Sequence, residues 1–136
     1  MKRIESMTPL FTCTIPTRAA IKKNGQRVVR TNGRRPCVIY SDLYKAWSRM
    51  AGNHIKMAMG LSSLIFPIKE PINLCVRFYF KDHQAEADLS NLYHGVEDML
   101  QSCGVIENDK LIVSHDGSRK IFGEEAKTEI EIRRIA

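Results

Sequence analysis

The stretch Ile72-Asn-Leu-Cys-Val-Arg-Phe-Tyr-Phe80 decides the fold, because its side chains alternate strictly. Every second position holds Ile, Leu, Val or Phe, and the positions between them hold Asn, Cys, Arg and Tyr. A period of two residues is typical of a strand with one face against a core. The sequence therefore predicts a strand over residues 72–80, with other elements packed on its apolar face.

A helical repeat follows this strand. From Asp88 onward apolar side chains recur three or four residues apart, at Leu89, Leu92, Val96, Met99, Leu100 and Cys103. The period of the pattern thus changes from 2 to about 3.6 near Asp88. We expect an amphipathic helix that runs to about Cys103, with Asp88 at the junction between strand and helix.

Shorter patterns surround this strand and helix. Alternating or β-branched runs predict further strands at residues 10–15, 28–29, 37–40, 111–115 and 128–132. A helix is expected to begin at Ser41 or Asp42, because either side chain is a good N-cap. The chain of 136 residues is then one α+β domain, a mainly antiparallel or mixed β-sheet with two principal helices.

The first helix is expected to carry Leu43, Trp47, Met50 and Ile55 on one face. Packing in the core explains this apolar row, and stacking of Trp47 on nucleic-acid bases is the alternative.

The segment after the 111–115 strand is expected to be a turn and a connection. His115 and Asp116 adjoin, but neighbouring residues on a strand point to opposite faces, so the sequence assigns them no joint role. Arg119 and Lys120 are placed in the connecting segment.

Acidic side chains gather where the strand gives way to the second helix. If the backbone stays extended through Glu86 and Asp88, the two residues lie on the same side, about 6.6 Å apart at about 3.3 Å per residue. Asp109 follows the helix, where the chain can return. Magnesium suits this arrangement, since it takes one or two carboxylates and leaves its other positions to water and phosphate. In the alternative interpretation Asp88 is an N-cap, Glu86 a solvated acid and Asp109 part of a turn.

The order and spacing of these residues resemble the RusA family of Holliday junction resolvases. The matching parts are Asp88-Leu-Ser-Asn-Leu92, the amphipathic helix and Gly104-Val-Ile-Glu-Asn-Asp-Lys110. In that family an Asp-Leu-Asp-Asn-Leu motif is followed after one residue by Lys, and a helix then leads to an acid-Asp pair. Asp88, Asn91 and Asp109 occupy matching positions, and His94 stands at the position of the lysine.

The resemblance implies a homodimer that cuts four-way DNA junctions in recombination and repair by phosphodiester hydrolysis. Magnesium is the expected cofactor, with manganese as an alternative, and Asp88, Asp109 and Glu86 are its candidate ligands. Asn91 is expected to orient the site, and His94 to contact phosphate or assist proton transfer. For His94 an ordinary place on the helix surface is the alternative.

Two departures from the family pattern touch the expected catalytic centre. Ser90 stands where a second Asp is usual, which removes a carboxylate that Glu86 is the candidate to replace. His94 replaces the lysine, and a histidine carries a positive charge only near or below its usual pKa of about 6.5. A weakened or inactive dimer that only binds junctions is therefore the alternative function.

The net charge of +6 is concentrated in the first part of the chain. Residues 1–49 contain eleven Lys and Arg and two acids, and residues 50–136 contain ten and thirteen. Such an excess suggests a polyanionic partner, bound in a salt-dependent way, although a solvated basic surface is the alternative. The candidate contacts to the DNA backbone are Lys22, Lys23, Arg34 and Arg35. A third interpretation of the function is a structural or protein-binding domain with an incidental basic face.

Several other classes of protein find no support. No apolar run approaches the roughly 18 residues of a membrane span, and Met-Lys-Arg-Ile-Glu lacks the apolar region of a secretory signal, so a cytoplasmic location is expected. The four cysteines form no Cys-x-x-Cys pair, which argues against a zinc ribbon or a thioredoxin-like motif. Cys75 and Cys103 are expected to be reduced and buried, with disulfides as the alternative.

Overall fold

The computed structural model describes residues 8–20, 27–29, 37–39, 42–81 and 88–135. Its main sheet has five strands: β1 (Phe11–Ile15), β4 (Ile72–Phe80), β5 (Ile112–Ser114), β6 (Arg119–Phe122) and β7 (Lys127–Arg134). The helices are α1 (Asp42–Leu61), α2 (Leu89–Ser102) and the short 3-10 helix η2 (Asp109–Leu111). The strands β2 (Arg27–Val29) and β3 (Cys37–Ile39) pair only with each other in a second sheet. The predicted α+β class is confirmed.

Strand β4 lies at the centre of the main sheet. It pairs antiparallel with β7 from Ile72 opposite Arg134 to Tyr79 opposite Lys127, and β1 pairs antiparallel with the other edge of β7. On its second edge β4 runs parallel to β5 near its beginning and to β6 near its end. The sheet is therefore mixed, and the strand predicted over residues 72–80 is confirmed with the same bounds.

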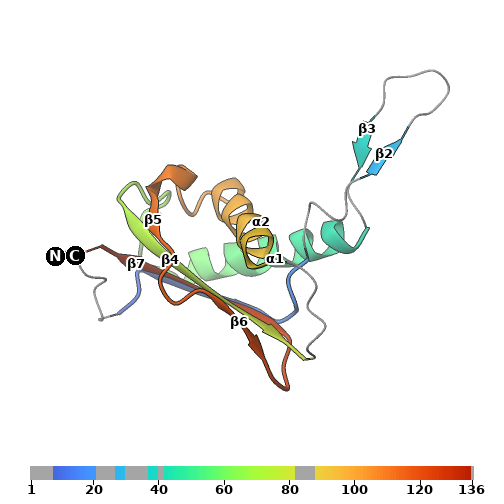
Figure 1. Ribbon diagram of the computed structural model, residues 1–136. Coiled ribbons are helices and arrows are strands. Elements are labelled where there is room, and N and C mark those ends of the chain that lie inside the picture. Colours follow the sequence, from blue (N-terminus) through green and yellow to red (C-terminus); the bar gives the residue numbers. More distant parts are fainter. Residues whose placement is uncertain (1–7, 21–26, 30–36, 40–41, 82–87, 136) are drawn as a thin grey trace.

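Both helices cover the same face of this sheet (Figure 1). The alternating side chains of β4 point into the core between sheet and helices: Ile72, Leu74, Val76, Phe78 and Phe80 are at most 2% exposed. Helix α2 contributes Leu92, Tyr93, Val96 and Leu100 to the same core. The pattern that identified the strand thus also fixes which face of the sheet receives α2.

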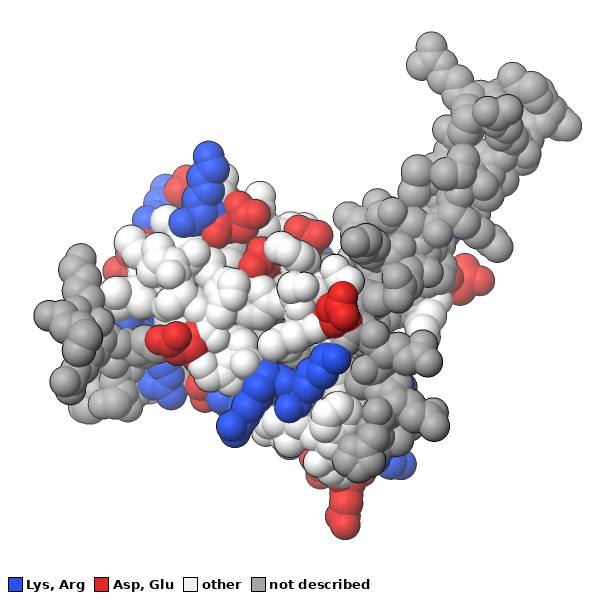
Figure 2. Space-filling model, in the orientation of Figure 1, with Lys and Arg blue, Asp and Glu red and all other residues white. Residues whose placement is uncertain are grey.

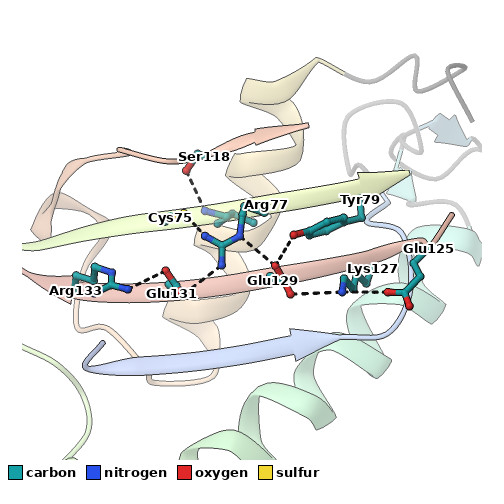
Figure 3. Close-up of polar contacts among 10 residues, drawn as sticks. Cys75, Arg77, Tyr79, Ser118, Glu125, Lys127, Glu129, Glu131 and Arg133 are labelled. Carbon is teal, nitrogen blue, oxygen red and sulfur yellow. Dashed lines mark hydrogen bonds and ion pairs between the residues drawn. The ribbon is translucent and has the colours of Figure 1, made fainter. Parts of the chain in front are cut away.

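The opposite face of the sheet carries a ladder of charged side chains, drawn in Figure 3. Arg77 of β4 lies between two acids of β7, with its Nε 3.1 Å from Oε1 of Glu129 and its Nη2 3.3 Å from Oε1 of Glu131. The hydroxyl of Tyr79 donates to Glu129 at 2.8 Å. On β7 the two acids are flanked by Lys127 and Arg133, which pair with Glu129 at 3.6 Å and with Glu131 at 3.5 Å, so each acid has basic neighbours.

The segment between β5 and β6 crosses this charged face above Cys75. Gly117 has φ +90°, and a Cβ at this position would lie 3.0 Å from Sγ of Cys75. Glycine is needed here for both reasons, because other residues avoid positive φ and the approach leaves no room for a side chain. Cys75 is therefore buried although its side chain points away from the helices.

The described thiols are free. Cys13, Cys75 and Cys103 form no disulfide, so the prediction of reduced Cys75 and Cys103 is confirmed, although Cys103 is only half-buried. Burial raises the pKa of Cys13 to about 11. The described residues contain no helix long and apolar enough to span a membrane.

The prediction for α1 is partly wrong. Trp47 and Ile55 are buried, as expected for core residues, but Leu43 is 74% exposed and Met50 is 41% exposed. The buried row is centred on Tyr44, Trp47, Ala51 and Ile55. Leu43 and Met50 lie roughly a quarter turn away from that row, at about 100° per residue. Helix α1 therefore has a second apolar row that faces away from the core.

The prediction for the segment after β5 is also partly wrong. Residues 119–122 were expected to be a connection, but they form β6, which pairs with residues 77–80 of β4. Edge pairing with β4 supplies the hydrogen bonds that keep this short run extended. The predicted final strand, residues 128–132, is confirmed within the longer β7.

Candidate functional site

Asp88 stands directly before α2 as its N-cap. Its backbone is extended, with φ −65° and ψ 145°, and its carbonyl accepts the first helical hydrogen bond from the amide of Leu92 at 3.1 Å. Its exposed side chain, however, makes no cap hydrogen bond. The simple interpretation as a capping side chain is therefore wrong, and the carboxylate oxygens are left for another partner.

Three polar side chains follow Asp88 along one side of α2. Asn91 is half-buried, His94 is exposed, and Glu97 lies one further turn along the helix. Residues three apart are neighbours on a helix surface, so these side chains form a continuous row. Nδ1 of His94 lies 3.6 Å from Oε2 of Glu97, although the His94 side chain is 70% exposed and that of Glu97 only 12%.

Asp109 is brought back beside α2 by the turn that ends the helix. Gly104, with φ +83°, closes this turn, and the amide of Val105 donates to the carbonyl of Leu100 at 2.9 Å, as in a Schellman motif. Asn108 then caps η2 by accepting from the amide of Lys110 at 2.8 Å. Asp109 is exposed at the first position of η2.

A second imidazole reaches this region from the segment after β5. The ring of His115 lies on the ring of Tyr93 from α2, with centroids 4.2 Å apart and planes inclined by 32°. The pattern of residues 111–115 predicts a strand that includes His115, but β5 ends at Ser114. The chain turns there because Asn73 accepts from the backbone amide of Asp116 at 2.8 Å.

Glu97 lies at the centre of these groups. Burial raises its pKa, the charges of His94 and His115 oppose this shift, and the carboxylate of Asp109 adds to it. The structure thus brings His94, Glu97, Asp109 and His115 into one electrostatic neighbourhood. Among the described residues, no three His, Cys, Asp or Glu side chains are placed together as a metal-binding group.

Asp88 lies at the N-terminal end of the same helix. It directly precedes Leu89, and Glu97 is eight residues beyond Leu89, or about 12 Å at about 1.5 Å per residue. Ser90, where the family has a second Asp, is exposed in the first turn of α2. At about 100° per residue Asp88 also lies about half a turn around α2 from Glu97, so the structure brings Asp109 beside Glu97 and not beside Asp88.

Several predicted site residues lie outside the described residues, so their expected roles stay predictions. They are Lys22, Lys23, Arg34, Arg35 and Glu86. On the face drawn in Figure 2, acidic and basic side chains of the described residues are interspersed around an area without charge.

Three residues of this region are not among the candidates predicted from the sequence. Glu97 has no sequence signal except its spacing of three from His94, and the pattern of residues 111–115 predicts a strand position for His115. Arg18 is the third: its guanidinium lies 5.4 Å from the ring centre of Phe80, the last residue of β4. This cation–π contact holds an exposed positive charge at the end of the strand that leads toward Asp88.

Comparison with known proteins agrees with the resemblance of the motif. The sequence model of the family described as endodeoxyribonuclease RusA matches residues 18–133. The match includes both long helices and all strands of the main sheet except β1 and the last residue of β7. A search among curated proteins finds no match. Because the match spans most of the 136 residues, this chain belongs to the RusA family of endodeoxyribonucleases.

Proposed function

We propose that this protein is a metal-dependent endonuclease that resolves Holliday junctions by hydrolysing DNA phosphodiesters. Membership of the RusA family supports a nuclease that acts on DNA junctions. The observation that carries the proposal for this chain is the uncapped, exposed carboxylate of Asp88 at the family's motif position. A side chain that served only the helix would make the cap hydrogen bond.

Magnesium fits the residues on this surface. It prefers hard oxygen donors and is usually held by one or two carboxylates together with water and substrate phosphate. Asp88 and Asp109 are both exposed and each offers such oxygens, but Asp109 lies beside Glu97 and not beside Asp88, so Glu86, two residues before Asp88, is the candidate to share a metal with Asp88. When bound, the metal would activate water and neutralise charge on the phosphate. Manganese is the alternative metal.

Asn91 and His94 on α2 are assigned the roles of orienting the site and of contacting the substrate. Asn91, half-buried between Asp88 and His94, is suited to orient the site through its amide. His94 presents an exposed imidazole to a phosphate or to a proton in transfer. Arg18, together with Lys22, Lys23, Arg34 and Arg35, is assigned to the DNA backbone, where positive charges position a protein without reading sequence.

A homodimer is part of the proposal, because two strands of a four-way junction must be cut at positions related by two-fold symmetry. The exposed apolar row of α1 supports an interface on that helix. Its members are Leu43, Met50, Met57 and Leu61, exposed by 74%, 41%, 65% and 89%. Leu43, Met50 and Met57 are spaced seven residues apart, as are the apolar contact positions of a coiled coil. A cytoplasmic location stays a prediction.

The test is incision of a labelled four-way DNA junction, with magnesium, manganese or a chelator, by the wild type and Asp88→Asn. We expect metal-dependent paired nicks from the wild type and none from the variant, with junction binding retained. Equal cutting by both proteins would remove Asp88 from the mechanism. Tight junction binding by both without nicks would instead favour the catalytically inactive binding dimer, to which the departures at Ser90 and His94 point.

A further inference from the structure

We propose that Glu97 is a positioning residue of the nuclease site, which holds the imidazole of His94 in the orientation that presents its Nε2 to a DNA phosphate. His94 can then contact a phosphate at the position where the family usually has a lysine. This inference rests on the proposed nuclease function.

The contact between the two side chains defines the orientation. Nδ1 of His94 faces Oε2 of Glu97 at 3.6 Å, within ion-pair range and longer than a short hydrogen bond. When a carboxylate lies at Nδ1, the other ring nitrogen, Nε2, is left to point elsewhere. Since the His94 side chain is 70% exposed, Nε2 is accessible to a ligand in solution.

The burial of Glu97 argues against an ordinary surface acid. Its side chain is only 12% exposed and it lies next to the buried Val96 on α2, whereas the adjacent Asp98 is exposed. Partial burial of a carboxylate costs free energy unless charged or hydrogen-bonding groups compensate it. The raised pKa of Glu97 reflects this burial, with opposing contributions from His94 and His115.

The partners of Glu97 distinguish this site from the structural ion pairs of the protein. On the opposite face of the sheet, Glu129 and Glu131 pair with Arg77, which is always charged (Figure 3). The described groups that face Glu97 are instead His94 on the same helix, His115 after β5, Asp109 on η2 and the phenol of Tyr93. The partners of Glu97 therefore include two imidazoles and no guanidinium or ammonium group among the described residues.

The phenol of Tyr93 does not compete for this contact as a charged group. Burial raises the pKa of Tyr93 and keeps its phenol neutral, so it adds no charge of its own.

Two measurements on the full-length chain test the proposal. The first compares the imidazole ¹⁵N NMR signals of His94 at neutral pH in the wild type, Glu97→Gln and Asp98→Asn. We expect the signals of His94 to move in Glu97→Gln and to stay in place in Asp98→Asn, which removes the same charge from the next residue. The signals of His54 on α1 serve as the internal reference. Unchanged His94 signals in Glu97→Gln would overturn the proposal.

The second measurement is incision of the four-way junction with magnesium. Glu97→Gln should slow cutting about tenfold at neutral pH, the lower end of the effect of removing a group that orients a ligand. In a His94→Lys background, Glu97→Gln should change little, because lysine has no imidazole ring for Glu97 to orient.

An equal loss in both backgrounds would show that Glu97 acts without His94 and would overturn the proposal. Thermal unfolding of each variant establishes that it is folded. If the wild type makes no nicks with any metal, the nuclease function fails, and the NMR comparison still decides whether Glu97 positions His94.

Discussion

The hydroxyl of Tyr93 donates a hydrogen bond of 2.6 Å to the backbone carbonyl of Leu74. This buried contact joins α2 to the centre of β4. The ring of Tyr93 also lies against the ring of His115, with the two ring centroids 4.2 Å apart. One aromatic side chain therefore fixes the distance of α2 from the sheet and supports an imidazole of the candidate site.

Replacement of Tyr93 by Phe should lower the free energy of unfolding by about 1 kcal/mol, the usual value for a lost hydrogen bond. The loss is limited because the carbonyl of Leu74 also accepts from Oγ of Ser118 at 3.2 Å. Urea denaturation should show a lower midpoint with an unchanged slope. Tyr79→Phe, which removes a hydroxyl from the half-exposed ladder, is the control and should cost less. Equal stability of Tyr93→Phe and the wild type would contradict this account.

Replacement of Asn73 should lower the free energy of unfolding by more, because this side chain is completely buried and forms hydrogen bonds with three polar groups. Its Oδ1 accepts from Oγ of Ser114 at 2.6 Å and from the amide of Asp116 at 2.8 Å, and its Nδ2 donates to the carbonyl of Asp116 at 3.2 Å. Asn73→Leu leaves these groups without their partner, and we expect a loss of about 2–3 kcal/mol of unfolding free energy. Ser114→Ala, which removes one of the three bonds, should cost clearly less in the same denaturation experiment. A similar cost for both variants would argue against Asn73 as the centre of this network.

How far the sequence predicts this fold depends on whether a segment carries its own pattern. The alternation of residues 72–80 and the helical repeat after Asp88 are local signals, and the bounds of β4 agree with the prediction. Strand β6 has no such alternation, and its extended form depends on pairing with β4. Leu43 and Met50 have the right residue type for a core, but periodicity alone does not separate two adjacent apolar rows on α1.

The candidate site likewise contains residues that the sequence identifies and residues that only the structure reveals. The positions of Asp88, Asn91 and Asp109 follow from a motif and its spacing, so the sequence identifies them. Glu97 is recognised only from its burial, and His115 only from its contact with Tyr93. Both properties arise from the packing of α2 against segments distant in the sequence, which a linear pattern does not contain.

Restoring the family pattern should raise activity. Ser90→Asp adds a carboxylate in the exposed first turn of α2, where the helix dipole favours negative charge, and His94→Lys adds a permanent cation. We expect the double variant to cut four-way junctions faster than the wild type and at lower magnesium concentration. A titration of incision rate against magnesium measures both effects. A slower double variant would indicate that Ser90 and His94 are adapted to each other in this chain.

The exposed apolar row of α1 gives a prediction for the dimer. Met50→Glu with Met57→Glu places two charges in that row and should convert a dimer into monomers, because burying unpaired carboxylates is costly. Sedimentation analysis measures the mass, and Lys45→Glu, an exposed change elsewhere on α1, is the control. A dimer that persists in the double variant would place the interface on another surface.

Stability should depend on pH through Glu97. Burial raises the pKa of this carboxyl in the folded protein above its ordinary value, so its contribution to stability is fully present below the ordinary pKa and is lost as pH rises through the raised value. The loss occurs because the folded state must then hold a partly desolvated carboxylate. Glu97→Gln lacks this titration. The free energy of unfolding of Glu97→Gln should therefore rise relative to that of the wild type as pH increases above the ordinary range of a glutamate, about pH 4. Paired urea denaturation curves across this range measure the difference, with Asp98→Asn as the control for a lost exposed charge. A difference that shrinks as pH rises would mean that the carboxylate of Glu97 stabilises the fold, and would weaken the case that it is kept for the site.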